Sequence, residues 1–204
     1  MFVVLVGPKG SGKSHIGRIL DHHLGVHFFH VEPLWMAYHA QCRASGREVN
    51  IPDGILAVHP AIKHALSVYD DVCVETTGAS PEILEDLLSL SPPESTLVVR
   101  TRAPLDVCLQ RIATRDQTNQ IPLDVETIKL VHGMSTSLEM PAAVTLENVS
   151  LSEAEILSAV LPAIRRTAGP AWLERQAAKG HVARHMACDL AAPPSARSDD
   201  DSAR

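Results

Sequence analysis

GPKGSGKS, at Gly7–Ser14, matches the pattern G-x-x-x-x-G-K-[ST] of loops that wrap phosphate groups, without a mismatch. The residues on both sides fit the same interpretation. Met1–Val6 is a short apolar run rich in β-branched residues, which predicts a buried strand leading into the loop. The apolar residues after the loop recur at helical spacing, at Ile16, Ile19, Leu20 and Leu24. Strand, glycine-rich turn and helix in this order predict a site for a nucleoside triphosphate.

Each residue type in this stretch has a chemical reason to be there. Gly7, Gly10 and Gly12 allow the backbone to bend so that successive N–H groups face one anion at a helix N-terminus. The Lys13 ammonium is expected to reach the β- and γ-phosphates, and the Ser14 hydroxyl to hold Mg²⁺. The residues predicted to contact ATP are Gly7, Pro8, Lys9, Gly10, Ser11, Gly12, Lys13, Ser14 and His15.

Composition excludes several other classes of protein. With 204 residues and 45% hydrophobic content, the chain is long enough for one domain with a core. A net charge of −6 and 3% aromatic residues argue against a nucleic-acid binder. Four scattered cysteines without a C-x-x-C pair predict reduced thiols and a cytoplasmic protein. No apolar run is long enough to span a membrane, and because Met1 leads directly into the first strand, we expect no cleaved signal sequence.

The rest of the chain alternates between strand and helix patterns, which predicts a parallel sheet covered on both faces. Further strands are expected at 26–30, 71–75, 95–101 and 143–146. Helices are expected at 33–44, 53–69 and 124–138, and after Ser80, Pro104 and Ser152, with Pro162 kinking or ending the last of these. A weak helix is expected within 169–189. Residues 190–204, with Pro193-Pro194 and three consecutive aspartates, are expected to form a disordered tail.

On these motifs the chain resembles the small P-loop kinases, the group that contains shikimate kinase, gluconate kinase and the nucleoside monophosphate kinases. The resemblance covers about residues 1–165, within an expected domain of 1–168. It implies an α/β fold, the three-layer α/β/α sandwich of P-loop NTPases, with a five-stranded parallel sheet in the order 2-3-1-4-5. It also implies an acceptor-binding insertion, here 31–71, and an arginine-bearing lid, here 111–123.

Arg111 and Arg115 are the candidate lid residues. They lie four apart, on one face of a helix that ends at a polar stretch, 114–122. The resemblance to adenylate-kinase-like enzymes implies that Arg111 stacks on the adenine and that Arg115 contacts the phosphates during catalysis. The alternative is a solvated pair of arginines that is favoured by the dipole at the C-terminus of the helix.

Two acids are candidates for the acceptor side of the site. Glu75 is expected at the end of the third strand, where a carboxylate can hold Mg²⁺ through water or orient the acceptor hydroxyl. The alternative is a carboxylate that only caps the following turn. Glu32 follows the second strand, where shikimate kinase carries aspartates at the positions of His30 and Glu32. Because His30 and Thr76-Thr77-Gly78 depart from the shikimate kinase pattern, they argue against shikimate as the acceptor.

Two other groups of side chains have weaker interpretations. Arg43, Arg47 and Lys63 lie in the insertion and either hold an anionic group or are ordinary surface charges. The histidines at positions 22, 23, 27 and 30, and the pair His185 and Cys188, do not have a recognised zinc spacing.

The expected function is ATP- and Mg²⁺-dependent phosphoryl transfer to a small-molecule acceptor, with Lys13, Arg111, Arg115, Glu75 and Glu32 as catalytic residues. The bound metal would be held by Ser14 and Glu75. The alternatives are a nucleoside monophosphate kinase, or a nucleotide-binding module that hydrolyses ATP slowly. No N-K-x-D motif is present, which argues against a GTPase switch. Neither nucleic acid nor membrane is an expected partner, and the chain is expected to be a monomer or a homodimer.

Overall fold

Five parallel strands form one sheet in the order β2-β3-β1-β4-β5. The computed structural model describes residues 1–115, 121 and 123–180. The strands are β1 (Phe2–Val6), β2 (His27–Phe28), β3 (Val72–Thr76), β4 (Thr96–Arg102) and β5 (Val144–Glu147). β1 lies in the centre with at most 1% of any residue exposed, because its run of branched apolar residues is covered on both faces. The predicted sheet and its strand order are confirmed.

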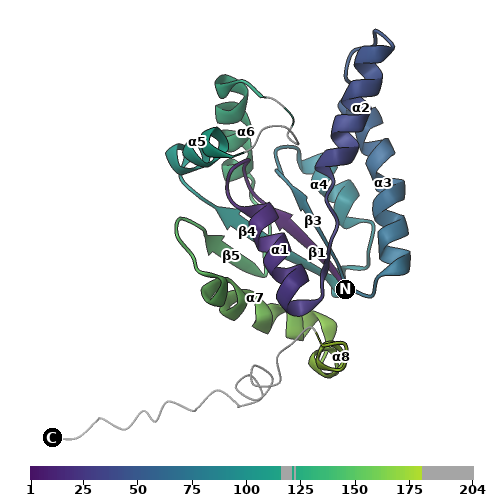
Figure 1. Cartoon of the computed structure of the whole chain (residues 1–204), viewed down its shortest axis with the longest axis vertical. Coiled ribbons are helices and arrows are strands. Elements are labelled where there is room, and N and C mark those ends of the chain that lie inside the picture. Colours follow the sequence, from purple (N-terminus) through teal and green to yellow (C-terminus); the bar gives the residue numbers. More distant parts are fainter. Residues whose placement is uncertain (116–120, 122, 181–204) are drawn as a thin grey trace, which may run out of the picture.

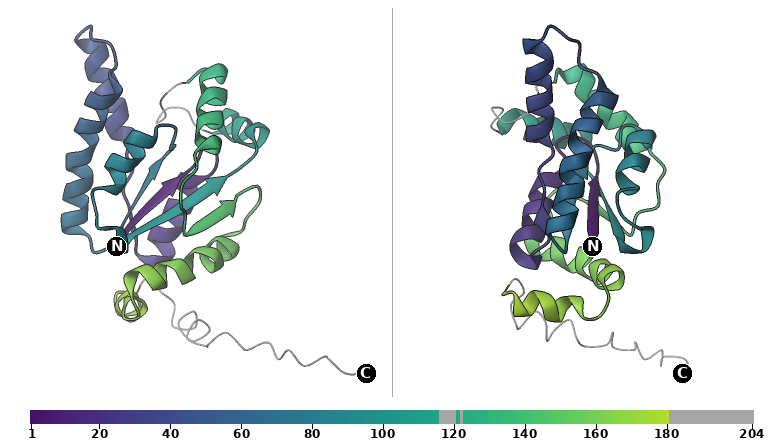
Figure 2. Two further views of the ribbon diagram at one scale, coloured as in Figure 1. Left: turned by 180° about the vertical axis from the view of Figure 1, so that it is seen from behind. Right: turned by 90° about the vertical axis from the view of Figure 1, so that its right-hand side faces the viewer.

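Helices cover the two faces of the sheet and complete the three layers (Figures 1 and 2). One core cluster joins residues of α1, α7 and α8 to one face, and a second joins residues of α3 and α4 to the other. Figure 1 shows α2 and α3 as a pair that extends beyond the sheet at the β2 edge. The helices are α1 (Lys13–Leu24), α2 (Glu32–Ala44), α3 (Ile51–Val68), α4 (Pro81–Leu88), α5 (Leu105–Thr114), α6 (Val125–Ser137), α7 (Glu153–Ala168) and α8 (Trp172–Ala178), with a 3₁₀ turn at Pro93–Ser95.

Local side-chain signals set several helix starts. The side chains of Ser80 and Asp124 accept hydrogen bonds from backbone N–H groups three residues ahead, at the starts of α4 and α6. Ser152 and Glu155 form the reciprocal capping box of α7. Asn50 caps α3 in the same way, so that helix begins at Ile51, with Pro52 in its first turn, and not at residue 53 as predicted.

One of the two outcomes predicted for Pro162, an end of the helix, is wrong, because α7 continues through it to Ala168. Because Pro162 has no backbone N–H, the carbonyl of Ser158 lacks its usual helical hydrogen bond. Both residues are exposed, so water can bond to that carbonyl instead. Leu161 and Ile164, on either side, are buried in the core and hold the helix in place. The second strand is also shorter than expected, with two residues at the edge of the sheet.

After α7 the chain packs against the end of the sheet opposite the phosphate-binding loop. Trp172 of α8 is fully buried, and its indole N–H donates to Asp71 at 2.8 Å. The expected weak helix is therefore present as the short α8, whereas residues 181–189 and the expected tail at 190–204 lie outside the described residues. Within the described part of the chain, no helix is both long and apolar enough to cross a membrane.

Candidate active site

The loop Gly7–Ser14 connects the central strand β1 to α1 and is shaped by left-handed glycines. Gly10 has φ of 85° and Gly12 has φ of 96°, a region that residues with a side chain rarely adopt. A Cβ atom on Gly10 would lie 2.6 Å from the carbonyl oxygen of Cys108, so α5 leaves no room for a side chain there. The predicted loop is therefore present, as a tight backbone turn at the N-terminus of a helix, which is the arrangement that binds phosphate.

Lys13 lies folded over this loop. Its side chain is buried, and its Nζ atom donates to the carbonyl oxygens of Gly7 at 2.8 Å and Pro8 at 3.0 Å. Burial lowers the pKa of Lys13, and the nearby Glu75 carboxylate opposes this shift. Because two neutral carbonyls compensate the charge only partly, a phosphate group is a better partner for this ammonium than its present ones.

Ser14 and Glu75 meet at the open end of the loop. The Ser14 hydroxyl lies 3.0 and 2.9 Å from the two carboxylate oxygens of Glu75 and donates to them. Oxygen ligands of this kind suit Mg²⁺, which usually takes few protein ligands and keeps water and substrate phosphates as the others. Among the described residues, no group of three or more His, Cys, Asp or Glu side chains that could hold a metal occurs.

Glu32, the second candidate acid for the acceptor, forms an ion pair with the phosphate-binding loop. One of its carboxylate oxygens accepts from Lys9 of the loop and from the backbone N–H of Ile121, both at 3.1 Å. Lys9 also donates to the carbonyl oxygen of Ile121 at 3.1 Å. The first residue of α2, the phosphate-binding loop and the segment after α5 therefore converge at one half-buried ion pair.

The two candidate lid arginines lie at the end of α5, on the same side of the molecule as the loop. Arg111 donates to the carbonyl oxygens of Gly10 at 3.3 Å and Val149 at 2.7 Å, so it ties α5 to the loop and to the segment after β5. Arg115 is close enough to Lys13 to act on its pKa. Of the predicted lid at 111–123, residues 116–120 and 122 lie outside the described residues.

Two polar residues that support the loop were missed in the sequence. Asn148, 4% exposed, donates from its amide to the carbonyl oxygen of Ser11 at 2.8 Å. Thr101 shares a 2.8 Å hydrogen bond with the Ser11 hydroxyl. Thr101 lies near the carboxyl end of β4, and Asn148 directly follows β5. This position at the carboxyl ends of strands is the signal that could have marked both residues as part of the site.

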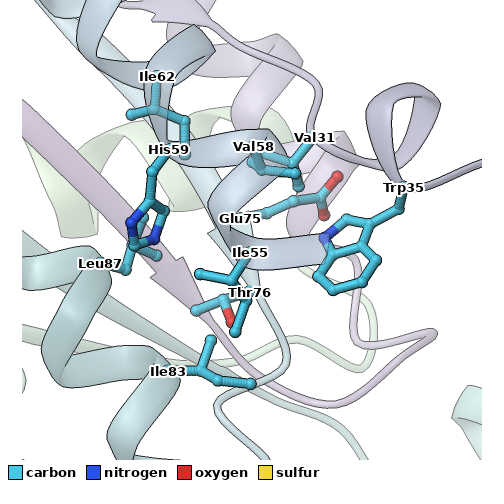
Figure 3. A pocket seen from close by; sticks show the side chains of 10 residues that line it. All are labelled: Val31, Trp35, Ile55, Val58, His59, Ile62, Glu75, Thr76, Ile83 and Leu87. Atoms are coloured by element: carbon cyan, nitrogen blue, oxygen red, sulfur yellow. The ribbon is translucent and has the colours of Figure 1, made fainter. Parts of the chain in front are cut away.

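A narrow pocket opens beside Glu75, on the side of the site formed by α2, α3 and α4 (Figure 3). Its volume is about 50 Å³. Seven of its ten lining residues are apolar, and the other three are His59, Glu75 and Thr76. The pocket adjoins the phosphate-binding loop, because the N–H of Gly7 donates to the carbonyl of Thr76 at 3.2 Å. This is the position expected for an acceptor.

Other residues considered in the sequence lie away from this pocket. Arg43, Arg47 and Lys63 are exposed, and none of them lines it. His15 is exposed on the first turn of α1, and His30 packs its ring against Phe28. The described part of the chain therefore places no lysine or arginine in the lining of the acceptor pocket.

Comparison with known proteins gives a likeness of fold. The sequence matches no family model, and no curated protein matches it. A gluconokinase from Sinorhizobium meliloti 1021 is 22% identical, with a TM-score of 0.56 over 80% of this chain and 91% of its own. Shikimate kinase from Aquifex aeolicus is 19% identical, with a TM-score of 0.51 over 83% of this chain and 100% of its own. Kti12 from Chaetomium thermophilum, in complex with ADP-AlF3, is 16% identical, with a TM-score of 0.59 over 83% and 100%. The chain has the fold of the small P-loop kinases.

Proposed function

We propose that this chain is an ATP-dependent small-molecule kinase that transfers the γ-phosphoryl group to an acceptor hydroxyl. The observation that carries the proposal is the contact between Ser14 and Glu75, at the boundary between the phosphate-binding loop and the acceptor pocket. A nucleotide-binding loop alone supports binding. A carboxylate that faces both the loop and a separate pocket supports transfer between two substrates.

The loop residues hold the donor. Backbone N–H groups of the loop and the Lys13 ammonium bind the β- and γ-phosphates, and in doing so Lys13 exchanges two carbonyl partners for phosphate oxygens. Arg111, which bonds to the carbonyls of Gly10 and Val149 beside the loop, is the residue that we expect to contact the adenosine part of ATP. The neighbour that holds ADP-AlF3 supports nucleotide binding by this fold.

Mg²⁺, when bound, neutralises charge on the β- and γ-phosphate oxygens, and Ser14 and Glu75 are the residues that would hold it. Glu75 also borders the pocket and accepts a hydrogen bond from the acceptor hydroxyl. A lone pair of that hydroxyl oxygen forms the new bond to the γ-phosphorus. The bond from that phosphorus to the bridging oxygen breaks, its electron pair leaves with ADP, and the hydroxyl proton passes to Glu75. Lys13 and Arg115 stabilise the charge on the group in transfer.

The direct test is ADP release by the purified protein with ATP, Mg²⁺ and single compounds from a panel of hydroxy acids, sugars, nucleosides and nucleoside monophosphates. Release that rises well above the blank with one class of acceptor supports a kinase. A slow rate that no acceptor changes, in a protein that binds ATP, supports a slowly hydrolysing nucleotide-binding module instead. Release driven only by nucleoside monophosphates assigns the chain to that class of kinase.

A further inference from the structure

The lining of the acceptor pocket is informative about the charge of the acceptor. Its apolar residues come from the loop before α2 and from α2, α3 and α4, and include Trp35, Ile55, Val58 and Ile83. Figure 3 shows the Glu75 carboxylate and the Trp35 indole toward one side of this lining and the His59 imidazole toward the other. Ile55 and Val58 are 9% and 4% exposed, so the wall formed by α3 is part of the core, whereas Trp35 and Ile83 are half-buried.

The charges around the pocket do not suit an anion. The formal negative charge in the lining is that of Glu75. His59 is the titratable base there, and burial lowers its pKa, with Asp86 and Lys63 acting on it in opposite directions. Neutral imidazole cannot compensate a carboxylate or a phosphate. An anionic acceptor would have to leave water and lie beside the Glu75 carboxylate. The described lining holds no lysine or arginine to compensate the charge of that acceptor, so its binding is strongly unfavourable.

We infer that the acceptor is a neutral alcohol with a largely apolar body, bound with its hydroxyl on Glu75 and its body against the walls formed by Trp35, Val58 and Ile83. The inference depends on the proposed kinase function. In the reaction the acceptor oxygen bonds to the γ-phosphorus, the bond to ADP breaks, and the hydroxyl proton goes to Glu75. The volume of about 50 Å³ is below that of typical ligand pockets, so binding of such an acceptor requires the pocket to widen.

Matched pairs of acceptors that differ in charge and by one methyl group test the inference, and the charged variant described below separates the two effects. Suitable probes are 3-phenyllactate, shikimate and 4-(hydroxymethyl)cyclohexanecarboxylate, each compared with its methyl ester, which keeps the same hydroxyls. The full chain is assayed with ATP and Mg²⁺, and transfer is followed as phosphorylated product. We expect kcat/KM for at least one ester to exceed that for its acid by about tenfold or more, since like charges brought together lose affinity.

A charge inserted into the lining provides a second test. Ile83 is half-buried, so Ile83→Lys adds a cation to the pocket wall, and Ile83→Met is the control without charge. Ile83→Lys is expected to lower the ratio of kcat/KM for the ester to kcat/KM for the acid. Ile83→Met should leave this ratio unchanged, and so should Lys63→Ala, which lies at an exposed site outside the lining. If Ile83→Lys does not fold, the comparison of esters with acids in the natural chain still decides the question.

The possible outcomes separate the inference from the function on which it rests. A preference for the acids, or a loss of acid turnover in Lys63→Ala, overturns the neutral-acceptor inference and leaves the kinase assignment in place. No transfer with either set, while another compound of the wider panel drives ADP release, overturns the inference and leaves the kinase assignment in place. No acceptor-dependent release with any compound of that panel, in a protein that ATP stabilises against heat, contradicts both. A preference for the esters supports both.

Discussion

The Ser14 hydroxyl donates to both carboxylate oxygens of Glu75, at 3.0 and 2.9 Å, across 61 residues of sequence. Ser14 stands at the start of α1 and Glu75 near the end of β3, the strand that pairs with β1. Parallel pairing of β1 and β3 brings the two carboxyl ends to the same edge of the sheet. The contact therefore joins the phosphate-binding loop to the proposed acceptor side of the site. A substitution of Glu75 tests the two roles proposed for it, holding Mg²⁺ and accepting the proton of the acceptor hydroxyl.

Glu75→Gln is expected to lower kcat by about 10²–10⁴ while ATP still binds, because the amide cannot take the acceptor proton. The measurement is acceptor-dependent ADP release, together with the shift of melting temperature on adding ATP. Glu85→Gln, at an exposed carboxylate on α4, is the matched control and should behave like the natural chain. Unchanged kcat in Glu75→Gln would remove this carboxylate from the mechanism.

Lys13→Met is expected to abolish turnover and to change how stability depends on pH. The pKa of Lys13 in the folded chain lies below its ordinary value of 10.5, so between these two values the unfolded chain binds more protons. The contribution of Lys13 to the free energy of unfolding therefore rises as pH increases through that window, and Lys13→Met lacks this rise. Urea unfolding of both proteins at pH 7 and at pH values approaching 10.5 measures the difference. If the difference in free energy of unfolding between the two proteins does not vary with pH, the pKa of Lys13 is not lowered in the folded chain.

Arg115→Ala is expected to lower kcat by about a thousandfold with little change in KM for ATP, as for a positioned arginine that acts on the phosphoryl group in transfer. Arg18→Ala, at an exposed arginine on α1, serves as the control. Steady-state kinetics with a saturating acceptor give both parameters. If kcat and KM stay within a factor of about two of the natural chain, Arg115 has no part in transfer.

Arg111→Ala is expected to weaken ATP binding and to destabilise the protein in the absence of ligand. It removes two hydrogen bonds to carbonyl oxygens, those of Gly10 and Val149, and the free energy of unfolding should fall by about 1 kcal/mol. Calorimetric titration with ATP and thermal melts measure the two effects. Normal ATP affinity with reduced stability would make Arg111 a purely structural residue.

Asn148→Ala is expected to cost about 1–3 kcal/mol of stability, since the buried carbonyl of Ser11 loses its amide donor. For a chain of this size each kcal/mol lowers the melting temperature by about 2–4 °C. ATP affinity should fall as well, because the loop loses its support. Asn50→Ala removes the cap of α3 and is the control, with a loss of stability and normal ATP affinity. Equal ATP affinities in the two variants would show that Asn148 does not shape the loop.

Much of the architecture could be predicted from the sequence because its signals are local. The loop motif and the helix caps at Ser80, Asp124 and Ser152 each depend on a few neighbouring residues, and the structure has them where the patterns put them. The strand order was implied by resemblance to the small P-loop kinases and not by any pattern in the residues. Pro162 shows the limit of local rules, since core packing on both sides overrides a proline in an exposed turn of the helix.

The sequence by itself determined that Gly7–Ser14 forms a phosphate-binding loop between a buried strand and a helix, because its bends need glycines at set positions. Tertiary structure alone decided the partners of the side chains around that loop. Glu32 pairs with Lys9, and Asn148 reaches Ser11 across 137 residues. The lining of the pocket beside Glu75 is likewise assembled from three helices, the loop before α2 and the end of β3, which are separated in the chain. Such contacts depend on how strands order and helices pack, which no short stretch of sequence encodes.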